Sequence, residues 1–153
     1  MLNPVSRLLV FPLLFIIFNQ SFATAATYNV LNLGAKPDGR TDSAKSFLNA
    51  WAAACGSVKP ATICVPRGRY LLHKAHFAGH CKNTAITIII DGTLLAPSDY
   101  HVIGNAHNWI LFEGVNAVSI RPSLRGGMLD GQGTGLWLCK ATGKSCPRGA
   151  SAT

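Results

Sequence analysis

The side chains that could catalyse hydrolysis in this sequence are its carboxylates. Glycoside hydrolysis needs two of them, one as an acid and one as a base or nucleophile, held about 5–9.5 Å apart. Asp91 and Asp130 each precede a glycine where a predicted strand ends, which is also a common position for a carboxylate that only supports a turn. Because no two acidic residues are adjacent, we interpret the carboxylates as structural rather than as a catalytic pair. The six are Asp38, Asp42, Asp91, Asp99, Glu113 and Asp130.

A second candidate for chemistry is the histidine-rich segment that ends at Cys81. A helix would bring His73, His76 and His80 to one face, where they and Cys81 could bind zinc. The strand-like flanks and Gly79 argue against such a helix. We therefore predict ordinary surface histidines, a disulfide-bonded Cys81, and no metal or cofactor.

Two further motifs are interpreted as non-catalytic. The sequence contains no G-x-S-x-G, and Ser145 and Ser151 lie in a predicted loop without a nearby histidine, so a serine hydrolase site is not expected. The glycines at 131 and 133 predict a turn, and they are not expected to bind phosphate because no helix is predicted after them.

The first 25 residues have the pattern of a secretory leader. Arg7 supplies a positive charge, and Leu8–Phe18 is an apolar core too short to span a bilayer. Residues 23–25 (Ala-Thr-Ala) offer the small side chains that a signal peptidase requires. We predict a signal peptide over residues 1–25 and a secreted, extracellular mature protein with no membrane association, with an uncleaved anchor as the alternative.

Secretion determines how the five cysteines are interpreted. In an oxidising compartment, disulfide bonds are expected rather than metal coordination, and an odd number leaves at least one thiol without an intramolecular partner. Cys64 lies in the strand-like run ATICV and is the candidate for a buried free thiol. Cys139 with Cys146, and Cys55 with Cys81, are possible pairs, but the sequence leaves the pairing open.

Short apolar runs separated by turns predict strands between Ala85 and Gly133. In the run AITIIID, Ile86, Ile88 and Ile90 lie on one face and Ile89 on the other, and strands that are apolar on both faces are typical of parallel sheets and solenoids. Ile88 and Leu111 are 23 residues apart, which predicts that they stack one coil apart in a β-solenoid. Further strands are predicted near Thr27–Val30 and Ala61–Val65.

One amphipathic helix is predicted ahead of this ladder. Thr41 or Asp42 is expected to cap its N-terminus, and Gly56 its C-terminus. The helix should cover the exposed first coil of the solenoid. From Gly133 onward only a turn and loops are expected. The predicted apolar face of the helix consists of Ala44, Phe47, Leu48, Trp51, Ala52 and Cys55.

The charge of the chain favours a polyanionic partner. There are 14 Lys and Arg against 6 Asp and Glu, a formal charge of +8, which becomes +7 once the leader with Arg7 is removed. Charged residues make up only 13% of the sequence, and no basic run is interleaved with aromatic residues. A dedicated nucleic-acid-binding protein is therefore not expected.

Several segments together resemble plant polygalacturonases, glycoside hydrolase family 28. The resemblance extends from Tyr28 to Pro147 and implies an all-β, right-handed parallel β-helix with an N-terminal capping helix. It also implies inverting hydrolysis of α-1,4 galacturonosyl bonds in pectin, a cell-wall location, and a monomeric full-length enzyme. The matching segments are YNVLNLGAKPDGRTDSAKSFLNAWAAACGS, VPRGRYLL, IDGTLLAPSDY, NWILFEGVNAVSI and LDGQGTGLW.

Two departures from the family pattern limit what the resemblance implies. The catalytic signatures Asn-Thr-Asp, Asp-Asp, Gly-His-Gly and Arg-Ile-Lys do not occur in the sequence, so no catalytic residue is carried over. Residues 26–153 are expected to be a truncated N-terminal part of the β-helix domain, inactive alone, with a non-catalytic pectin- or cell-wall-binding protein as the alternative. The segment Arg121–Arg125 is additional to the family pattern. It is either an extra loop or, like the end at Thr153, the result of a misplaced splice junction.

Overall fold

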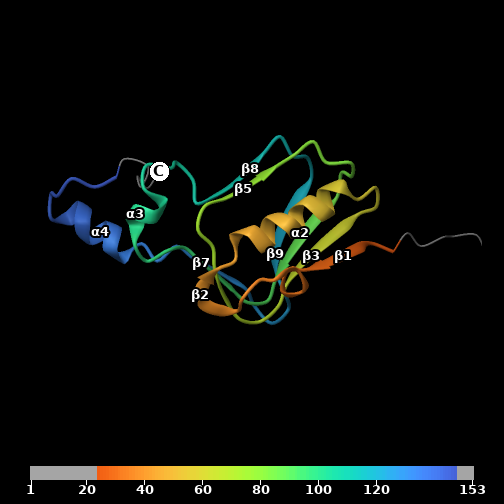
Figure 1. Ribbon diagram of the computed structural model, residues 1–153, viewed down its shortest axis with the longest axis horizontal. Helices are drawn as coiled ribbons and strands as arrows, with labels where there is room; N and C mark the ends of the chain where they lie inside the picture. The colour runs from red at the N-terminus through yellow and green to blue at the C-terminus, as the bar shows by residue number, and fades with distance from the viewer. Residues whose placement is uncertain (1–23, 148–153) are drawn as a thin grey trace, which may run out of the picture.

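The computed structural model describes residues 24–147, which form a parallel β-helix with three sheets (Figure 1). Every strand pairing between coils is parallel, as the strand composition predicted. The first sheet stacks four strands in the order β1 (Ala26–Asn29), β3 (Ala61–Val65), β6 (Ile86–Ile90) and β9 (Val118–Pro122).

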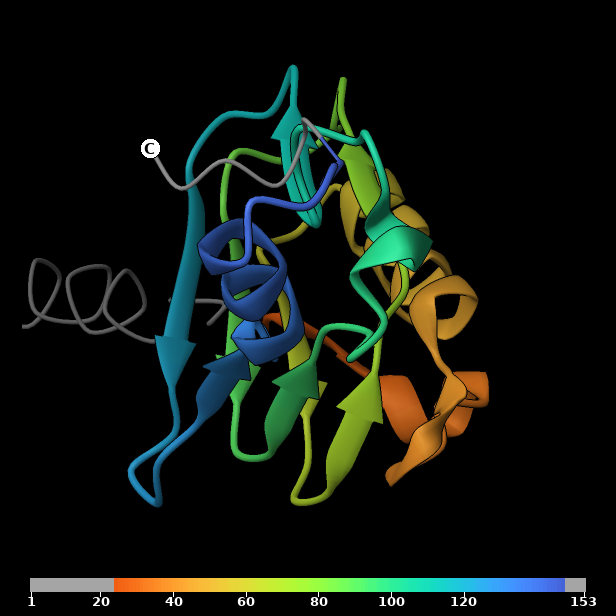
Figure 2. The ribbon, with the colours of Figure 1, turned by 90° about the vertical axis from the view of Figure 1, so that its left-hand side faces the viewer.

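The second and third sheets complete the coils. The second contains β2 (Asp38–Asp42), β4 (Arg69–Leu71), β7 (Thr93–Leu95) and β10 (Met128–Asp130), and the third contains β5 (Ala75–Ala78) and β8 (Ile110–Glu113). Tight turns join the first sheet to the second along one edge of the stack (Figure 2). The helical elements are η1 (Val30–Leu33), α2 (Ala44–Gly56), α3 (Tyr100–Ile103) and α4 (Thr134–Ala141).

Alternation along the strands of the first sheet determines which side chains enter the core. In β3 and β6 every second residue is buried, so Ile86, Ile88 and Ile90 point inward, as predicted. Ile63 stacks directly on Ile88, and equivalent residues of successive coils therefore form continuous apolar columns inside the helix.

The predicted stacking of Leu111 on Ile88 is wrong. Ile88 pairs with Ile120 of β9, 32 positions further along, whereas Leu111 lies in β8 and pairs with His76 of β5. Ile88 and Leu111, 23 residues apart, therefore belong to two different sheets of the solenoid. The error arises because each coil contributes several apolar strands, and periodicity alone does not show which sheet a strand joins.

The helix α2 covers the first coil on the side of the third sheet, as predicted. It packs against β1, β3 and β5, and the Trp51 indole N–H donates to the backbone carbonyl of Ala78 in β5 at 2.8 Å. The indole thereby provides a partner for a strand carbonyl at the start of the third sheet. The predicted cap is wrong: the N-cap of α2 is Ser43, whose side chain makes no capping hydrogen bond. The Asp42 carboxylate, one residue earlier, accepts from the backbone N–H of Ala44 at 3.0 Å.

The buried face of α2 differs partly from the predicted one. Leu48 is only half-buried and Ala52 is exposed, while Ala50 and Ala54 are fully buried. The small alanine side chains allow the helix to approach the strands closely. Gly56 is also not a left-handed cap: it is the last residue of the helix, and the C-cap is Ser57, whose φ is −69°. The buried residues of α2 are Ala44, Phe47, Ala50, Trp51 and Ala54.

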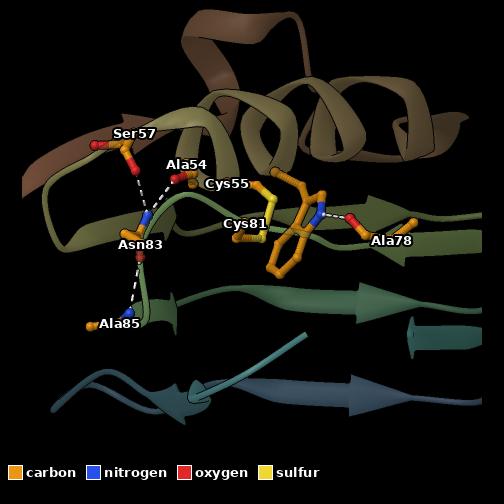
Figure 3. The surroundings of a disulfide bond; sticks show 8 residues. Ala54, Cys55, Ser57, Ala78, Cys81, Asn83 and Ala85 are labelled. Atoms are coloured by element: carbon orange, nitrogen blue, oxygen red, sulfur yellow. Dashed lines mark hydrogen bonds between the residues drawn. A yellow bond between two sulfur atoms is a disulfide. The ribbon is translucent and has the colours of Figure 1, made fainter. Parts of the chain in front are cut away.

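A disulfide bond between Cys55 and Cys81 joins the end of α2 to the turn before β6 (Figure 3). This is one of the two possible pairs identified in the sequence. Close by, the buried Asn83 side chain donates to the carbonyls of Ala54 and Ser57 and accepts from the backbone N–H of Ala85. All of its polar atoms have partners, so it joins the helix, the turn and the strand together.

A helix also forms where only a turn and loop were predicted. The helix α4 begins at Thr134, directly after Gly133, and lies at the same end of the molecule as α3 (Figure 1), where Gly135 comes close to Tyr100. A second disulfide bond, Cys139–Cys146, joins the helix to the segment after it and confirms the other possible pair. Within residues 24–147 no helix is long and apolar enough to cross a bilayer. The predicted leader lies outside the described residues except for its last two positions.

Candidate functional site

Each of the six carboxylates has its own set of local partners. Asp38 accepts from the backbone N–H groups of Arg40 and Thr41, and Asp130 accepts from the backbone N–H of Gln132. These are the contacts of carboxylates that support turns. These contacts do not test whether a carboxylate is catalytic. That no catalytic residue is present stays a prediction from the sequence, which lacks the family's catalytic signatures.

The segment His73–His80 does not form the helix that a zinc site would need. Residues 75–78 form the strand β5, which leaves His76 exposed on the outer face, and Cys81 is in a disulfide bond. The described residues include no group of three or more His, Cys, Asp or Glu side chains placed to hold a metal ion.

Two of these histidines face carboxylates from other elements. The Nε2 atom of His76 lies 2.9 Å from Oε2 of Glu113 on the neighbouring strand β8. His73 Nδ1 lies 3.4 Å from Oδ2 of Asp42, whose Oδ1 also accepts from the His73 backbone N–H at 3.0 Å. Both pairs are solvent-accessible and contribute little to stability. Each histidine–carboxylate pair links two neighbouring segments of the chain. The two pairs are separate and do not form one site with an acid and a base.

Hydrogen bonds to the carboxylate make Asp38 and Asp99 stronger acids than usual. The Thr41 and Arg40 backbone N–H groups and the Thr41 hydroxyl lower the pKa of Asp38 from 3.8 to about 2. The backbone N–H of His101, and then its side chain, lower the pKa of Asp99. Both carboxylates are therefore poorer candidates for a general acid than an ordinary aspartate.

The lowered pKa of Asp38 predicts a pH-dependent contribution to stability. Because the folded-state pKa is below the unfolded value, the contribution is complete above pH 3.8 and is lost as the pH falls through about 2. The Asp38→Asn variant should therefore be less stable than the wild type near neutral pH, and this difference should shrink toward pH 2. Chemical denaturation at a series of pH values measures it. A difference that stays constant across that range would contradict the assignment.

Cys64 is the free thiol that the sequence indicated, but it is half-buried rather than buried. It is in register with Ile89 on the outer side of the first sheet. Burial raises the pKa of the Cys64 thiol, which leaves little thiolate at neutral pH. The residue is therefore not an activated nucleophile.

An apolar cavity of 360 Å³ opens at the last described coil. Its walls include Phe77 and Phe112, whose rings stack with centroids 4.7 Å apart, and the half-exposed Ile120 of β9. It contains no carboxylate, so it is the interior of the solenoid rather than a site for acid–base chemistry.

A polar cluster that the sequence did not reveal lies on the turns that join the first sheet to the second. Asp91 lies 3.6 Å from Nε of Arg67 in the preceding coil, and accepts a hydrogen bond of 2.5 Å from the Ser123 hydroxyl in the following coil. The sequence does show a turn after each equivalent strand. To predict that the side chains on these turns meet, one must also know which residues of successive coils are in register, and the sequence did not show that.

The chain is similar in sequence to a family of carbohydrate-active enzymes. The profile of glycosyl hydrolases family 28 matches residues 55–151. A polygalacturonase of Prunus persica is 59% identical over 134 residues, which cover 87% of this chain and 33% of that protein. A polygalacturonase of Gossypium hirsutum is 41% identical over 134 residues, covering 87% of this chain and 31% of that protein.

An exopolygalacturonase of Zea mays is 39% identical over 111 residues, covering 72% of this chain and 26% of that protein. The chain thus spans about a third or less of the length of these relatives. The profile match covers most of the chain and includes β3 to β10, the strands of the parallel ladder. On this evidence the chain is a member of glycosyl hydrolases family 28.

Proposed function

We propose that this chain forms the N-terminal cap and first coils of a secreted polygalacturonase. Such an enzyme is an inverting glycosidase that hydrolyses the α-1,4 galacturonosyl bonds of pectin. The observation that carries the proposal is the 59% identity to the Prunus persica polygalacturonase over 87% of this chain. The parallel ladder with α2 packed at its start is the architecture that the resemblance implies for this part of such an enzyme.

We further propose that this stretch does not catalyse hydrolysis by itself. It lacks all four catalytic signatures, and its carboxylates support turns, accept from the first backbone N–H of α2 or pair with basic side chains. In an enzyme of the relatives' length, another coil would cover the exposed Ile120 and Met128 of the edge strands β9 and β10. The acid and the water-activating aspartates would then come from those further coils.

The proposed partner is pectin, in its de-esterified, polyanionic form, at the plant cell wall. The positive charge, +7 without the predicted leader, supports it, because a net positive charge concentrates an acidic polysaccharide near the protein. The leader-like first 25 residues and the two disulfide bonds support an extracellular location, since disulfides persist in oxidising compartments.

Pectin hydrolysis is expected only from a longer product of the same gene. The 153-residue chain should release no reducing ends from polygalacturonic acid above a buffer control, whereas a product that continues into the four signatures should release them readily. A reducing-end assay of both proteins, with the transcript sequenced across Ile120–Gly126 and past Thr153, tests this. Turnover by the 153-residue chain would refute its inactivity, and an inactive longer product with all four signatures would refute the proposed hydrolase.

A second candidate is a secreted protein that binds pectin or the cell wall without cleaving it. The missing signatures together with the basic charge favour it. It requires that the mature chain be a cooperatively folded monomer that polygalacturonate retains in a salt-sensitive manner. Size-exclusion chromatography, a thermal melt and retention at several salt concentrations distinguish it from a chain that needs further coils to fold.

A further inference from the structure

We propose that the turn between β9 and β10 forms a binding site for the carboxylates of polygalacturonate. The site, here called the basic groove, is an open hollow of 560 Å³. It goes beyond the proposed function, which it uses only to identify the polyanion. Its lining residues are Ile89, Asp91, Arg121, Pro122, Ser123, Leu124 and Arg125.

The turn that carries the groove is held by hydrogen bonds. The Ser123 backbone N–H donates to the carbonyl of Ile90 in the neighbouring coil at 2.8 Å, and the Ser123 carbonyl accepts from the Gly126 N–H at 3.1 Å. The Ser123 hydroxyl also accepts from the Arg125 backbone N–H at 3.1 Å. The turn lies on the edge of the stack along which tight turns join the first sheet to the second, beside the turn that joins β6 to β7 (Figure 2). These bonds fix the backbone of the turn that carries Arg125 before any ligand binds, so the turn itself need not be ordered on binding.

The charges of the groove favour an anion. Its only acidic residue is Asp91, and Arg67 lies 3.6 Å from that carboxylate and offsets its charge. Arg121 and Arg125 are exposed, and none of the ion pairs within residues 24–147 involves either of them. The guanidinium groups are therefore available to form bidentate hydrogen bonds with carboxylates.

The shape and the apolar lining of the groove favour a carbohydrate chain. Ile89, Pro122 and the fully exposed Leu124 provide apolar surface against which the C–H faces of sugar rings can pack. No aromatic side chain lines the groove, so it lacks the stacking platforms that single-stranded nucleic acids use. A polysaccharide with a carboxylate on each sugar provides both kinds of contact.

The two arginines of the groove lie in Arg121–Arg125, where the sequence departs from the family pattern that it otherwise resembles. In β9, Arg121 is in register with Ile89, which places it on the outer side of the first sheet. Arg121 and Arg125 are both exposed where they line the groove, so a long polymer can reach them.

Binding of de-esterified polygalacturonate tests the proposal. The Arg121→Gln/Arg125→Gln variant of the 153-residue chain should bind about tenfold more weakly, because two solvent-screened charge-assisted contacts are lost. Lys45→Gln/Lys59→Gln is the matched control, with the same change in charge at exposed lysines outside the groove. The control should bind within about twofold of the wild type.

Two further measurements test whether binding depends on the positive charge of the arginines and on the carboxylates of the polysaccharide. Arg121→Lys/Arg125→Lys keeps the charges and should retain part of the lost affinity, while fully methyl-esterified pectin should not distinguish the wild type from the glutamine variant. Isothermal titration calorimetry at fixed salt gives the affinities, and circular dichroism establishes that each variant is folded. The glutamine changes leave the Arg125 backbone N–H bond in place, so a native spectrum is expected.

Three outcomes would overturn the proposal. The first is a wild-type affinity for the Arg121→Gln/Arg125→Gln variant, and the second is an equal loss in the lysine control. The third is tighter binding of an oligonucleotide than of polygalacturonate through the same arginines, which would refute the assigned partner. None of them depends on catalysis, so an inactive longer enzyme would refute the proposed hydrolase and leave this test unaffected.

Discussion

Replacing Trp51 with alanine is expected to lower the free energy of unfolding by about 3–5 kcal/mol. The side chain is 4% exposed, and its ring packs edge-on against Phe77 and Phe112 with centroids 5.5 and 5.6 Å away. Its indole N–H also donates to the Ala78 carbonyl. The substitution therefore leaves a cavity between α2 and the third sheet and removes the partner of a strand carbonyl. Equilibrium denaturation followed by circular dichroism measures the change.

Two related variants separate the causes of this loss. Trp51→Phe keeps an aromatic ring but not the N–H donor, and should cost about 1–3 kcal/mol, because the Ala78 carbonyl loses its partner. Trp137→Ala removes a 55% exposed tryptophan of α4 and should change stability by no more than about 0.5 kcal/mol. If Trp51→Ala cost no more than Trp137→Ala, α2 would not be packed on the first coil as described.

Removing the Cys55–Cys81 disulfide is expected to lower the free energy of unfolding by about 3–4 kcal/mol. The bond joins residues 26 positions apart, so it restricts a loop that includes β3, β4 and β5 in the unfolded chain. In the folded state it holds the end of α2 against the turn before β6 (Figure 3). The measurement is the denaturation midpoint of Cys55→Ala/Cys81→Ala compared with the wild type under non-reducing conditions.

The other cysteines provide the controls. Cys139→Ala/Cys146→Ala opens a bond across only seven positions and should cost about 2 kcal/mol, because a shorter loop loses less entropy on closure. Cys64→Ala removes a thiol without removing a cross-link. A loss in Cys55→Ala/Cys81→Ala no larger than that in Cys64→Ala would contradict the stabilising role of the bond.

Both predictions concern the contact between the capping helix and the first coil. This contact covers the exposed start of the third sheet, which in later coils is covered by another strand. If either variant unfolded the chain completely under mild conditions, the small size of the domain would account for it, since total stabilities are only about 5–15 kcal/mol. Trp51→Phe and the wild type under reducing conditions would then provide graded comparisons.

The local elements of the fold were largely predictable from the sequence. The alternation in residues 86–90 identified both the strand and its buried face, because the direction of each side chain in a strand depends only on a two-residue repeat. The helix over residues 44–56 followed from a three- and four-residue repeat in the same way. The two disulfide bonds were among the pairs considered, and Cys64 was the expected free thiol.

Contacts between distant segments were not predictable to the same extent. Stacking of Leu111 on Ile88 was expected, but the length and path of the connecting turns place Ile120 there instead. The helix α4 was missed because Gly133 and Gly135 are poor helix formers. In the structure Gly135 packs close to Tyr100, and the Cys139–Cys146 bond holds the other end of the helix.

The missing family signatures and the positions of the carboxylates led to the prediction that no catalytic residue is present, and the charge led to the prediction of a polyanionic partner. Both depend on residue types, which the sequence determines completely. Tertiary structure decided which of those residues meet. Arg67, Asp91 and Ser123 lie in three successive coils, and Asp91 contacts both of the others only because equivalent turns align. The physical reason is that strand direction and helical periodicity are local properties of the backbone, whereas the register between coils depends on the packing of the whole core.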